Sequence, residues 1–361
     1  MIDYPEFVLP IFSELPDTGT IRCTSPSNIA LVKYWGKRPV QLPENASISF
    51  TLDACKTTTS LSYKKKNKIS EDFDFELFFE GNPKPDFKPK IQNFFKRIEA
   101  YVPFLKNYAF TIETSNTFPH SSGIASSASG MSALAFCIMQ LEKKINPNIV
   151  EEEFLKKTSF LARLGSGSAC RSLEGPITVW GEHKGIEGSN DTFAIKFPHS
   201  IHKNFIDYQD AILLIDKGEK QVSSTVGHDL MHGHPFAAKR FEQASENITR
   251  LKEILISGDL DSFIEVVESE ALTLHAMMMT SLPYFILMKP NTLSVINKVW
   301  EYRKKTGSKL CFTLDAGANV HLLFPNSEKE KVLGFITNEL VAYCQNGQYI
   351  CDKIGLGAKL L

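Results

Sequence analysis

A stretch of glycine, serine and alanine that opens directly into a helix places the strongest constraint on how this chain folds. It runs from Thr117 to Gly130 and reads TFPHSSGIASSASG. Apolar residues then recur at helical spacing through Leu141. Small side chains let a ligand approach the backbone, and a helix start offers unpaired N–H groups at the positive end of its dipole. The segment therefore predicts an anion cradle for nucleotide phosphates, with a plain serine-rich turn before a core helix as the alternative.

The familiar phosphate-binding loops are absent from the sequence. It contains no G-x-x-x-x-G-K-[ST] string, and the glycines of Gly165-Ser-Gly-Ser-Ala-Cys170 lack the third member of the dinucleotide fingerprint. ATP binding by this chain would therefore use a different kind of loop.

The overall composition limits the classes of protein to which the chain can belong. Its 361 residues, 43% of them hydrophobic, suffice for a substantial core divided over two domains. Forty basic and 41 acidic residues give a net charge of −1, so the chain as a whole shows no bias toward nucleic acid or an anionic membrane. No run approaches 18 apolar residues and the first residues do not read as a signal peptide, so we expect neither a membrane span nor secretion. Seven cysteines without C-x-x-C pairs predict reduced thiols in the cytoplasm.

Strand and helix patterns alternate without regularity along the chain, which favours an α+β fold over a doubly wound parallel sheet. The charged run at 64–72 predicts a solvated hairpin tip. The polar segment 198–204 predicts a domain boundary. Strands are expected at 47–52, 57–63, 73–79, 177–180, 193–197, 210–215, 311–314 and 321–324, and helices at 88–101, 124–144, 151–164, 235–256, 259–279 and 290–305.

Two further segments concentrate positive charge and hydroxyl groups. In the first, Lys33 and Lys37 flank an aromatic pair and a glycine, which suits them to a phosphate or a carboxylate, or to an aromatic-anchored surface turn. In the second, Gly165 to Ser172 forms two Gly-Ser units beside Arg171, with Arg163 just before them. Such a backbone nest with arginines predicts anion binding, with a glycine turn that ends a helix as the alternative.

Two weaker segments complete the set of polar candidates. Ser223 and Ser224 follow a basic loop and can either cap a helix or contact phosphate. Asp315 stands at a predicted strand end beside Gly317, either as a turn residue or as a carboxylate directed at a reacting hydroxyl. His228 and His232 share one face of a helix, but no cysteine or glutamate accompanies them to support a metal site.

Taken together, these segments resemble the mevalonate diphosphate decarboxylase family of the GHMP-kinase superfamily. Five of its motifs occur in the family's order between residues 22 and 325. The resemblance implies an N-terminal ribosomal-S5-domain-2-like domain, 1–203, and a C-terminal ferredoxin-like domain, 204–361, with the active site between them. The motifs are N-I-A-x-x-K-Y-W-G-K at 28–37, the phosphate loop at 119–128, G-S-G-S-A-C-R-S at 165–172, V-S-S at 222–224 and D-A-G-x-N at 315–319.

The resemblance also implies an activity. The family phosphorylates the 3-hydroxyl of mevalonate 5-diphosphate with ATP, and loss of phosphate and CO2 then gives isopentenyl diphosphate in the mevalonate pathway of isoprenoid biosynthesis. Phosphoryl transfer of this kind normally requires Mg2+, carried by the ATP phosphates, and no protein ligand for it is identified. A homodimer is expected, with neither nucleic acid nor membrane as a partner.

The residues that match the family's functional positions fall into three groups. The catalytic set is Asp315, Lys33 and Arg171, which would respectively handle the 3-hydroxyl, the transferring charge and the substrate carboxylate. The substrate-binding set is Asn28, Tyr34, Lys37, Ser166, Ser168 and Ser224, and the ATP-binding set is Pro119, Gly123, Ser126, Ser127, Ala128 and Ser129.

The chain departs from the family pattern at two places. His120-Ser121-Ser122 replaces the usual T-A-A, and Ala318 replaces a proline. The alternatives are a decarboxylase acting on mevalonate 5-phosphate and a small-molecule kinase that stops before decarboxylation. Loops near 64–71 and 101–108 are candidates for holding the adenine.

Overall fold

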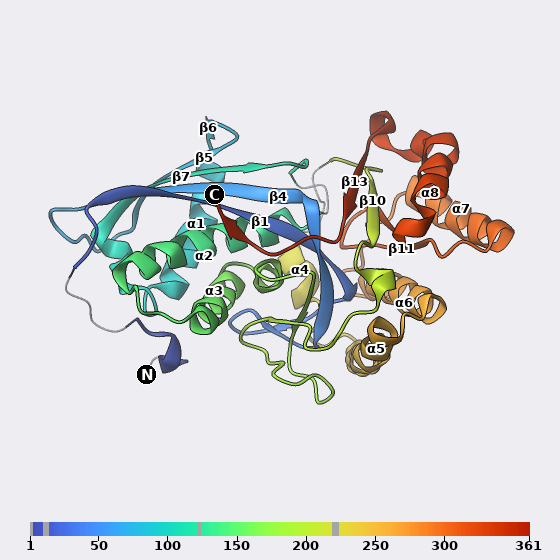
Figure 1. Cartoon of the computed structure of the whole chain (residues 1–361), viewed down its shortest axis with the longest axis horizontal. Helices are drawn as coiled ribbons and strands as arrows, with labels where there is room; N and C mark the ends of the chain where they lie inside the picture. The colour runs from blue at the N-terminus through green and yellow to red at the C-terminus, as the bar shows by residue number, and fades with distance from the viewer. Residues whose placement is uncertain (1–2, 10–13, 121–123, 219–223) are drawn as a thin grey trace.

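The computed structural model describes residues 3–9, 14–120, 124–218 and 224–361, apart from the side chain of Ser224. Within these residues, a mixed eight-stranded sheet occupies one end of the molecule and an antiparallel four-stranded sheet the other (Figure 1). The predicted α+β class is confirmed. None of the described helices is long and apolar enough to cross a membrane.

The larger sheet is built on two long antiparallel strands, β1 (Thr18–Val32) and β4 (Ser47–Lys65). β7 (Tyr108–Asn116) pairs with the other edge of β4, and β5 (Asp74–Phe79) runs parallel to β7. The strand order is β14-β1-β4-β7-β5-β6, and β8 pairs with the first part of β4. The shorter strands are β2 (Lys37–Arg38) and β3 (Leu42–Pro43), which pair with each other, and β6 (Asn82–Pro83), β8 (Ile177–Trp180), β9 (Ile195–Lys196) and β14 (Lys359–Leu360).

Two predictions about this sheet are wrong. Residues 47–52 and 57–63 belong to one strand, β4, rather than to two. The charged run at 64–72 is not a hairpin tip, because β7 lies between β4 and β5. β5, the helix that follows it and β7 form a parallel crossover, which needs an intervening helix rather than a tight turn.

α1 (Lys88–Ile98) and α2 (Ser126–Ile145) pack on the larger sheet, and α3 (Glu151–Gly165) packs against both helices (Figure 1). Their apolar residues and those of β1, β4, β5 and β7 form one buried cluster, which includes Ile21, Leu61, Phe95, Leu134 and Phe160. The predicted helices of this region are thus confirmed, and their apolar periodicity marks the faces that contact the sheet.

The smaller sheet has the order β11-β12-β10-β13, with all neighbouring strands antiparallel. Its strands are β10 (Gln209–Leu213), β11 (Cys311–Thr313), β12 (Val320–Phe324) and β13 (Tyr349–Lys353). Its helices are α4 (Ser224–Asp229), α5 (Ala237–Ser257), α6 (Leu260–Met279), α7 (Pro290–Thr306) and α8 (Lys329–Phe335). The 3-10 turns are Pro5–Phe7, Pro85–Phe87, Pro103–Asn107, Gly167–Ser172, Lys203–Phe205, Asn326–Glu328, Val341–Tyr343 and Gln345–Gly347, and Ile336–Leu340 is a π-helical turn.

The two halves of the molecule share a buried core, and hydrogen bonds also join them. One buried cluster combines Ile29 and Phe50 of the long strands with Leu251 of α5 and Phe263 of α6. The carboxylate of Asp352 on β13 accepts hydrogen bonds of 2.7–2.8 Å from the backbone N–H groups of residues 53–55. The C-terminal strand β14 also returns to pair with β1. The division at residue 203 therefore stays a prediction, although it falls between β9 of the larger sheet and β10 of the smaller.

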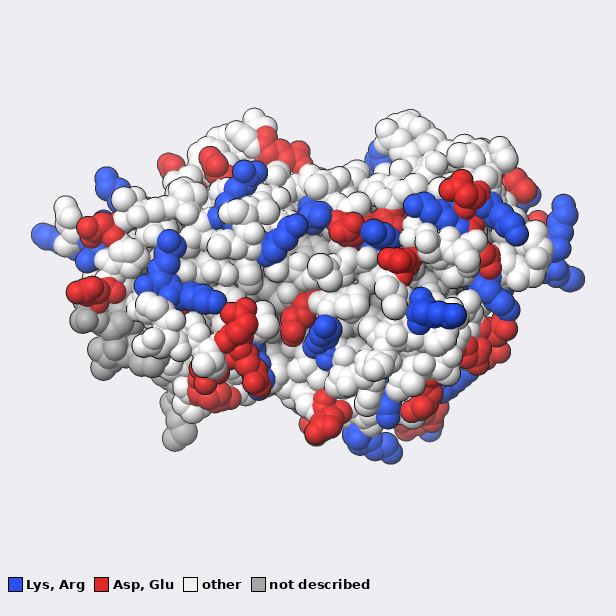
Figure 2. Space-filling view, in the orientation of Figure 1, with Lys and Arg blue, Asp and Glu red and all other residues white. Residues whose placement is uncertain are grey.

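Charged side chains of both signs are interspersed on the face shown in Figure 2, and no single sign dominates it. This distribution agrees with the near-zero net charge of the chain.

Candidate active site

An ion pair between buried Lys33 and partly exposed Asp315 joins the two sheets. Lys33 directly follows β1 and is 1% exposed, and its Nζ donates a 3.1 Å hydrogen bond to Oδ1 of Asp315. Asp315 lies in the turn between β11 and β12, and its side chain is 26% exposed. Burial lowers the pKa of Lys33, and the Asp315 carboxylate opposes that shift. The contact brings together two predicted catalytic residues that are 282 positions apart in the chain.

The turn that carries Asp315 is held by hydrogen bonds at each of its corners. The N–H of Gly317 donates to the Asp315 carbonyl at 2.7 Å, and Thr292 Oγ1 of α7 donates to the Ala318 carbonyl at 2.7 Å. The Asn319 side chain accepts from the N–H of Asp216 at 2.9 Å. These contacts fix the turn although Ala318 stands where the family pattern has proline.

Arg171 lies in the 3-10 turn Gly167–Ser172 and is 4% exposed. Its Nη1 donates to Ser47 Oγ at 2.5 Å, and its guanidinium lies 5.9 Å from the centre of the Trp180 ring. Burial lowers the pKa of this guanidinium. Among the described residues its Nε has no hydrogen-bond partner. A buried guanidinium with a free donor is suited to an incoming carboxylate.

The neighbouring Arg163 has a different environment. It is also buried, but its guanidinium donates to the backbone carbonyls of Thr192 at 2.7 Å and Val40 at 2.6 Å. It therefore ties two loops together through its Nε and Nη1 atoms.

Asn28 on β1 is hydrogen-bonded to the Gly-Ser segment at 165–172. Its Nδ2 donates to the Ser168 carbonyl at 3.2 Å and to Ser172 Oγ at 2.8 Å. Its Oδ1 is buried and, within the described part of the chain, has no hydrogen-bond partner. Ser166 and Ser168 are partly exposed at the end of α3 and in the turn after it. The structure thus brings Asn28, Ser168 and Arg171 into one local arrangement, as the motif predicts.

The two aromatic residues before Lys37 in the chain form a cluster with His228. The rings of Tyr34 and Trp35 lie 4.2 and 4.6 Å from the ring of His228 on α4. His228 Nδ1 accepts from the N–H of Gly36 at 3.0 Å, and burial lowers the pKa of His228 to about 3. Lys37 Nζ lies 3.7 Å from Asp229 Oδ1. His228 therefore packs as a neutral ring, and the described residues contain no group of three or more His, Cys, Asp or Glu that could hold a metal.

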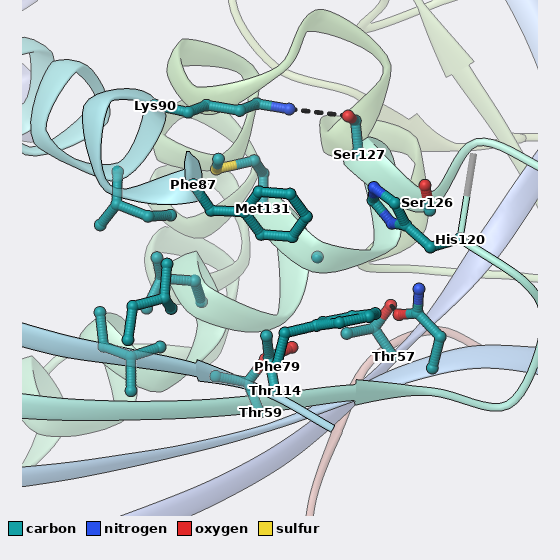
Figure 3. A pocket seen from close by; sticks show the side chains of 16 residues that line it. Thr57, Thr59, Phe79, Phe87, Lys90, Thr114, His120, Ser126, Ser127 and Met131 are labelled. Carbon is teal, nitrogen blue, oxygen red and sulfur yellow. Dashed lines mark hydrogen bonds between the residues drawn. The ribbon is translucent and has the colours of Figure 1, made fainter. Parts of the chain in front are cut away.

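A cavity of about 150 Å³ lies between α1, α2 and the larger sheet (Figure 3). Ser126 and Ser127 of the first helical turn line it, and Lys90 Nζ of α1 donates to Ser127 Oγ at 2.7 Å. Phe79, Phe87 and His120 form an aromatic wall, with ring centres 5.1–5.7 Å apart. The remaining lining residues are Thr57, Thr59, Leu77, Ile91, Ile112, Thr114, Asn116, Gly130, Met131 and Leu134.

The other predicted ATP-binding residues differ in burial, and Gly123 lies outside the described residues. Ser129 is buried, and its hydroxyl lies 2.7 Å from that of Thr57 on β4. Ala128 is also buried, and Pro119 is half-exposed. Gly123, Ser121 and Ser122 lie outside the described residues, as does the side chain of Ser224 at the start of α4. Among the members of the predicted set that the structure describes, Ser126 and Ser127 line the cavity.

The cavity and the ion pair are linked through β1. Ser27 Oγ donates to the carbonyl of Ile124 at 2.5 Å, just before α2. Ser25 Oγ donates to Ser132 Oγ at 2.7 Å, within α2. One strand therefore anchors the start of α2 and then positions Lys33.

Comparison with known proteins assigns the family. Residues 25–194 match the description "Diphosphomevalonate decarboxylase-like N-terminal domain", and residues 211–355 match "Mevalonate 5-diphosphate decarboxylase C-terminal domain". The chain belongs to the diphosphomevalonate decarboxylase family. The sequence-based prediction of this family, and with it of an enzyme of the lyase class, is confirmed.

Individual relatives agree over nearly the whole length. The diphosphomevalonate decarboxylase of Saccharomyces cerevisiae is 28% identical over 338 residues, which are 88% of this chain and 81% of that protein. The mevalonate diphosphate decarboxylase from Enterococcus faecalis, in a structure concerned with mevalonate diphosphate mediated ATP binding, is 27% identical with a TM-score of 0.79 over 95% of this chain and 99% of its own. A structure of MDDEF in complex with MVAPP, AMPPCP and magnesium covers the same shares at 27% identity, with a TM-score of 0.81.

Several polar residues around the site were not predicted from the sequence. Arg240, Asn247, Glu270 and His275 surround the backbones of Lys33 and Asp315, and Lys90 lies at the cavity. A signal for the first group is present in the sequence: Glu270 stands on the helical stripe that also contains Phe263, Val267 and Leu274, where an apolar residue is expected.

Proposed function

We propose that Lys33, Asp315 and Arg171 carry out the family's reaction, the ATP-dependent decarboxylation of mevalonate 5-diphosphate to isopentenyl diphosphate. The partly buried Lys33–Asp315 contact is the observation on which this proposal rests. It places an acceptor for a hydroxyl proton next to a cation that can stabilise transferring charge, at the junction of the two sheets.

The first step is phosphorylation of the 3-hydroxyl. The Asp315 carboxylate holds or accepts the hydroxyl proton while the 3-oxygen attacks the γ-phosphorus of ATP, and ADP leaves. The Lys33 ammonium, 3.1 Å from that carboxylate, stabilises its negative charge and the charge on the phosphoryl oxygens. The protein forms no covalent bond to the phosphoryl group, because phosphoryl transfer of this kind is catalysed mainly by positioning and electrostatics.

The second step is loss of phosphate and CO2. The bond between C3 and its oxygen breaks with the electron pair leaving on phosphate, and the electrons of the carboxylate carbon–carbon bond form the new double bond. Arg171 would hold the substrate carboxylate through the guanidinium edge that is not fixed by Ser47. Tyr34, Lys37, Asn28, Ser166, Ser168 and Ser224 remain the proposed contacts of the substrate and its diphosphate.

ATP is the co-substrate, and we place it in the cavity between α1 and α2. The purine ring would lie against the aromatic wall of Phe79, Phe87 and His120, and the phosphates would point toward Ser126, Ser127 and Lys90. The loops at 64–71 and 101–108, expected to hold adenine, do not line this cavity. The helix start and the Lys90 ammonium supply the positive field that a triphosphate requires.

Mg2+ accompanies the nucleotide, as it does in the complex of the relative MDDEF. The hydroxyl oxygens of Ser126 and Ser127 are hard donors of the kind that Mg2+ takes beside phosphate oxygens and water. The residues at the cavity therefore fit an ion carried mainly by the nucleotide, which would neutralise phosphate charge when bound.

A coupled assay tests the proposed function. With ATP, Mg2+ and mevalonate 5-diphosphate, we expect ADP, phosphate and CO2 in equal amounts. Parallel reactions with mevalonate 5-phosphate distinguish the monophosphate decarboxylase, and ADP without CO2 would identify a kinase. Turnover of mevalonate 5-diphosphate without nucleotide would contradict the proposal.

Two further properties implied by the family remain proposals: a homodimer and a cytoplasmic location. Sedimentation equilibrium of the purified chain tests the first, with a mass twice 40.5 kDa expected. Subcellular fractionation tests the second.

A further inference from the structure

Helix α6 places two buried polar side chains against the backbones of the two residues in the cross-sheet ion pair. Glu270 and His275 lie five positions apart on this helix, about 7.5 Å along its axis. Glu270 is completely buried and His275 is 1% exposed. Both side chains contact peptide groups: Glu270 the backbone N–H of Lys33, and His275 the backbone carbonyl of Asp315.

Glu270 holds the peptide of Lys33. Its Oε2 accepts from the backbone N–H of Lys33 at 2.8 Å. Arg240 of α5 pairs with both oxygens of Glu270 and also donates to the Lys33 carbonyl at 3.2 Å. Asn247 donates to Glu270 Oε1 at 2.7 Å, and Asn45 donates to the Lys33 carbonyl at 3.0 Å. Both the N–H and the C=O of this residue are therefore fixed by side chains.

His275 holds the peptide of Asp315. Its Nε2 lies 3.2 Å from the Asp315 carbonyl oxygen. Burial lowers the pKa of His275 to about 4, so the ring is neutral at physiological pH. A carbonyl can only accept, so the neutral ring carries its proton on Nε2 and donates it to Asp315.

The buried Glu270–Arg240 pair is a poor means of stabilising a fold. Taking two charges out of water costs about as much as their attraction returns, and apolar residues of similar volume often stabilise as well or better. The pair instead fixes the direction of the Lys33 peptide, which an apolar replacement cannot do. Misplacement of a reacting group by about 1 Å can cost roughly a hundredfold in rate.

We propose that α6 is the positioning element of the active site: Glu270, completed by Arg240, fixes Lys33, and His275 fixes Asp315, so that one helix sets the geometry of the catalytic pair. This inference rests on the proposed function, since it assigns Glu270 and His275 to the positioning of residues whose catalytic role is proposed above.

The test uses two variants of the helix, each with a matched control elsewhere. His275→Leu removes a histidine-to-carbonyl hydrogen bond, and His183→Leu removes an equivalent one between His183 Nε2 and the Ser245 carbonyl at 3.0 Å. Glu270→Gln breaks a buried ion pair, and Glu142→Gln breaks the equally buried pair of Glu142 with Lys157, whose ammonium also donates to a backbone carbonyl. All four variants lose a buried polar contact, so their thermal stabilities can be compared directly.

We expect kcat to fall at least tenfold in His275→Leu and Glu270→Gln, with KM for ATP and for mevalonate 5-diphosphate within twofold of wild type. The controls should keep kcat within twofold at a similar loss of Tm. His275→Gln, whose side-chain amide retains a donor, should recover part of the kcat that His275→Leu loses. If Glu270→Gln does not fold, the three histidine variants decide the question alone.

The positioning role is overturned if kcat of His275→Leu stays within twofold of that of His183→Leu, or if His275→Gln is as impaired as His275→Leu. Lys33→Met and Asp315→Asn, measured alongside, separate this outcome from failure of the proposed function. If these two variants lose turnover while the α6 variants keep it, only the positioning role is wrong. If Lys33→Met, Asp315→Asn, His275→Leu and Glu270→Gln all keep wild-type turnover, the catalytic assignment itself is wrong.

Discussion

The Lys33–Asp315 pair and the cavity between α1 and α2 differ in how their polar groups are held. Lys33 is buried, and its peptide is fixed on both sides by side chains from another part of the chain. Lys90, by contrast, is an exposed residue of α1, and its ammonium donates a hydrogen bond to Ser127 Oγ. The proposed catalytic pair is therefore held in place before substrate binds, whereas the proposed nucleotide cavity has groups that can adjust to a ligand.

This difference predicts which kinetic parameter each region controls. Preorganised charge stabilises the transition state, so changes at the ion pair should appear in kcat. Adjustable groups around the nucleotide contribute to binding in ground and transition states alike, so changes at the cavity should appear in KM for ATP. Substitutions in each region test whether kcat or KM changes as this distinction predicts.

The largest effect is expected from Lys33→Met, which keeps the aliphatic stem and removes the ammonium. Loss of one preorganised stabilising group costs about 10²–10³-fold in turnover. AMPPCP affinity, measured by titration calorimetry, should change less than threefold. A matching loss of AMPPCP affinity would place Lys33 with the nucleotide instead and remove the distinction between the two regions.

A second effect concerns stability and pH, and it arises from the burial around the ion pair. The pKa of His275 is lowered to about 4 by burial, with the neighbouring Lys33 lowering it further and Asp315 opposing. An unfolded histidine titrates near 6.5. Between pH 6.5 and 4 the unfolded chain therefore binds a proton that the folded chain does not, and the folded state loses up to about 3 kcal/mol as pH falls.

Chemical denaturation at pH 7, 5.5 and 4.5 measures this effect. The free energy of unfolding of wild type should fall more steeply with decreasing pH than that of His275→Leu, and both should be flat above pH 7 as far as this group is concerned. Parallel curves for the two proteins would show that folding does not lower the pKa of His275.

Arg171→Lys should reduce turnover by roughly tenfold, because lysine keeps the charge but loses one hydrogen bond to a charged group, worth about 1.5 kcal/mol. CO2 release should suffer while the affinity for ATP stays unchanged. The two are measured by trapping CO2 and by AMPPCP titration. Parallel losses in both would instead assign Arg171 to the nucleotide.

The smallest effect is expected at Lys90, in the cavity. Lys90→Met removes an exposed cation, whose pairing contributes up to about 1 kcal/mol, so KM for ATP should rise up to about fivefold while kcat stays near wild type. Lys298→Met, at an exposed ion pair with Glu339 outside the cavity lining, serves as the control. A large fall in kcat for Lys90→Met would show that this cation acts on the transferring phosphoryl group.

The sequence predicted the α+β class, the long helices and the family, because periodicity and local motifs are properties of short segments. It did not predict the course of the chain around β5, since charged residues after β4 look the same before a hairpin and before a crossover. Local patterns marked Lys33 and Asp315 as polar candidates in separate segments, and the resemblance grouped them in one catalytic set. Their contact depends on packing between segments 282 positions apart, which no local pattern encodes.

The polar residues behind the ion pair were missed for a different reason. Arg240, Asn247 and Glu270 stand on the apolar stripes of α5 and α6, and a reading by periodicity counts such residues as exceptions. Buried polar groups need partners, so several of them on facing stripes indicate a network. Lys90 carried no such signal, because a lysine near the start of a surface helix is ordinary.

We propose that Asp315 acts in the chemistry of the 3-hydroxyl and not in folding or nucleotide binding. Rapid-quench measurement of ADP formation by Asp315→Asn, under single turnover with saturating mevalonate 5-diphosphate, tests it most directly. Asparagine keeps the size and hydrogen bonding but cannot take the proton, so the rate should fall at least about a hundredfold, with Tm and AMPPCP affinity nearly unchanged. A normal rate of ADP formation, together with a much lower Tm, would show that Asp315 is a turn residue and would contradict the account.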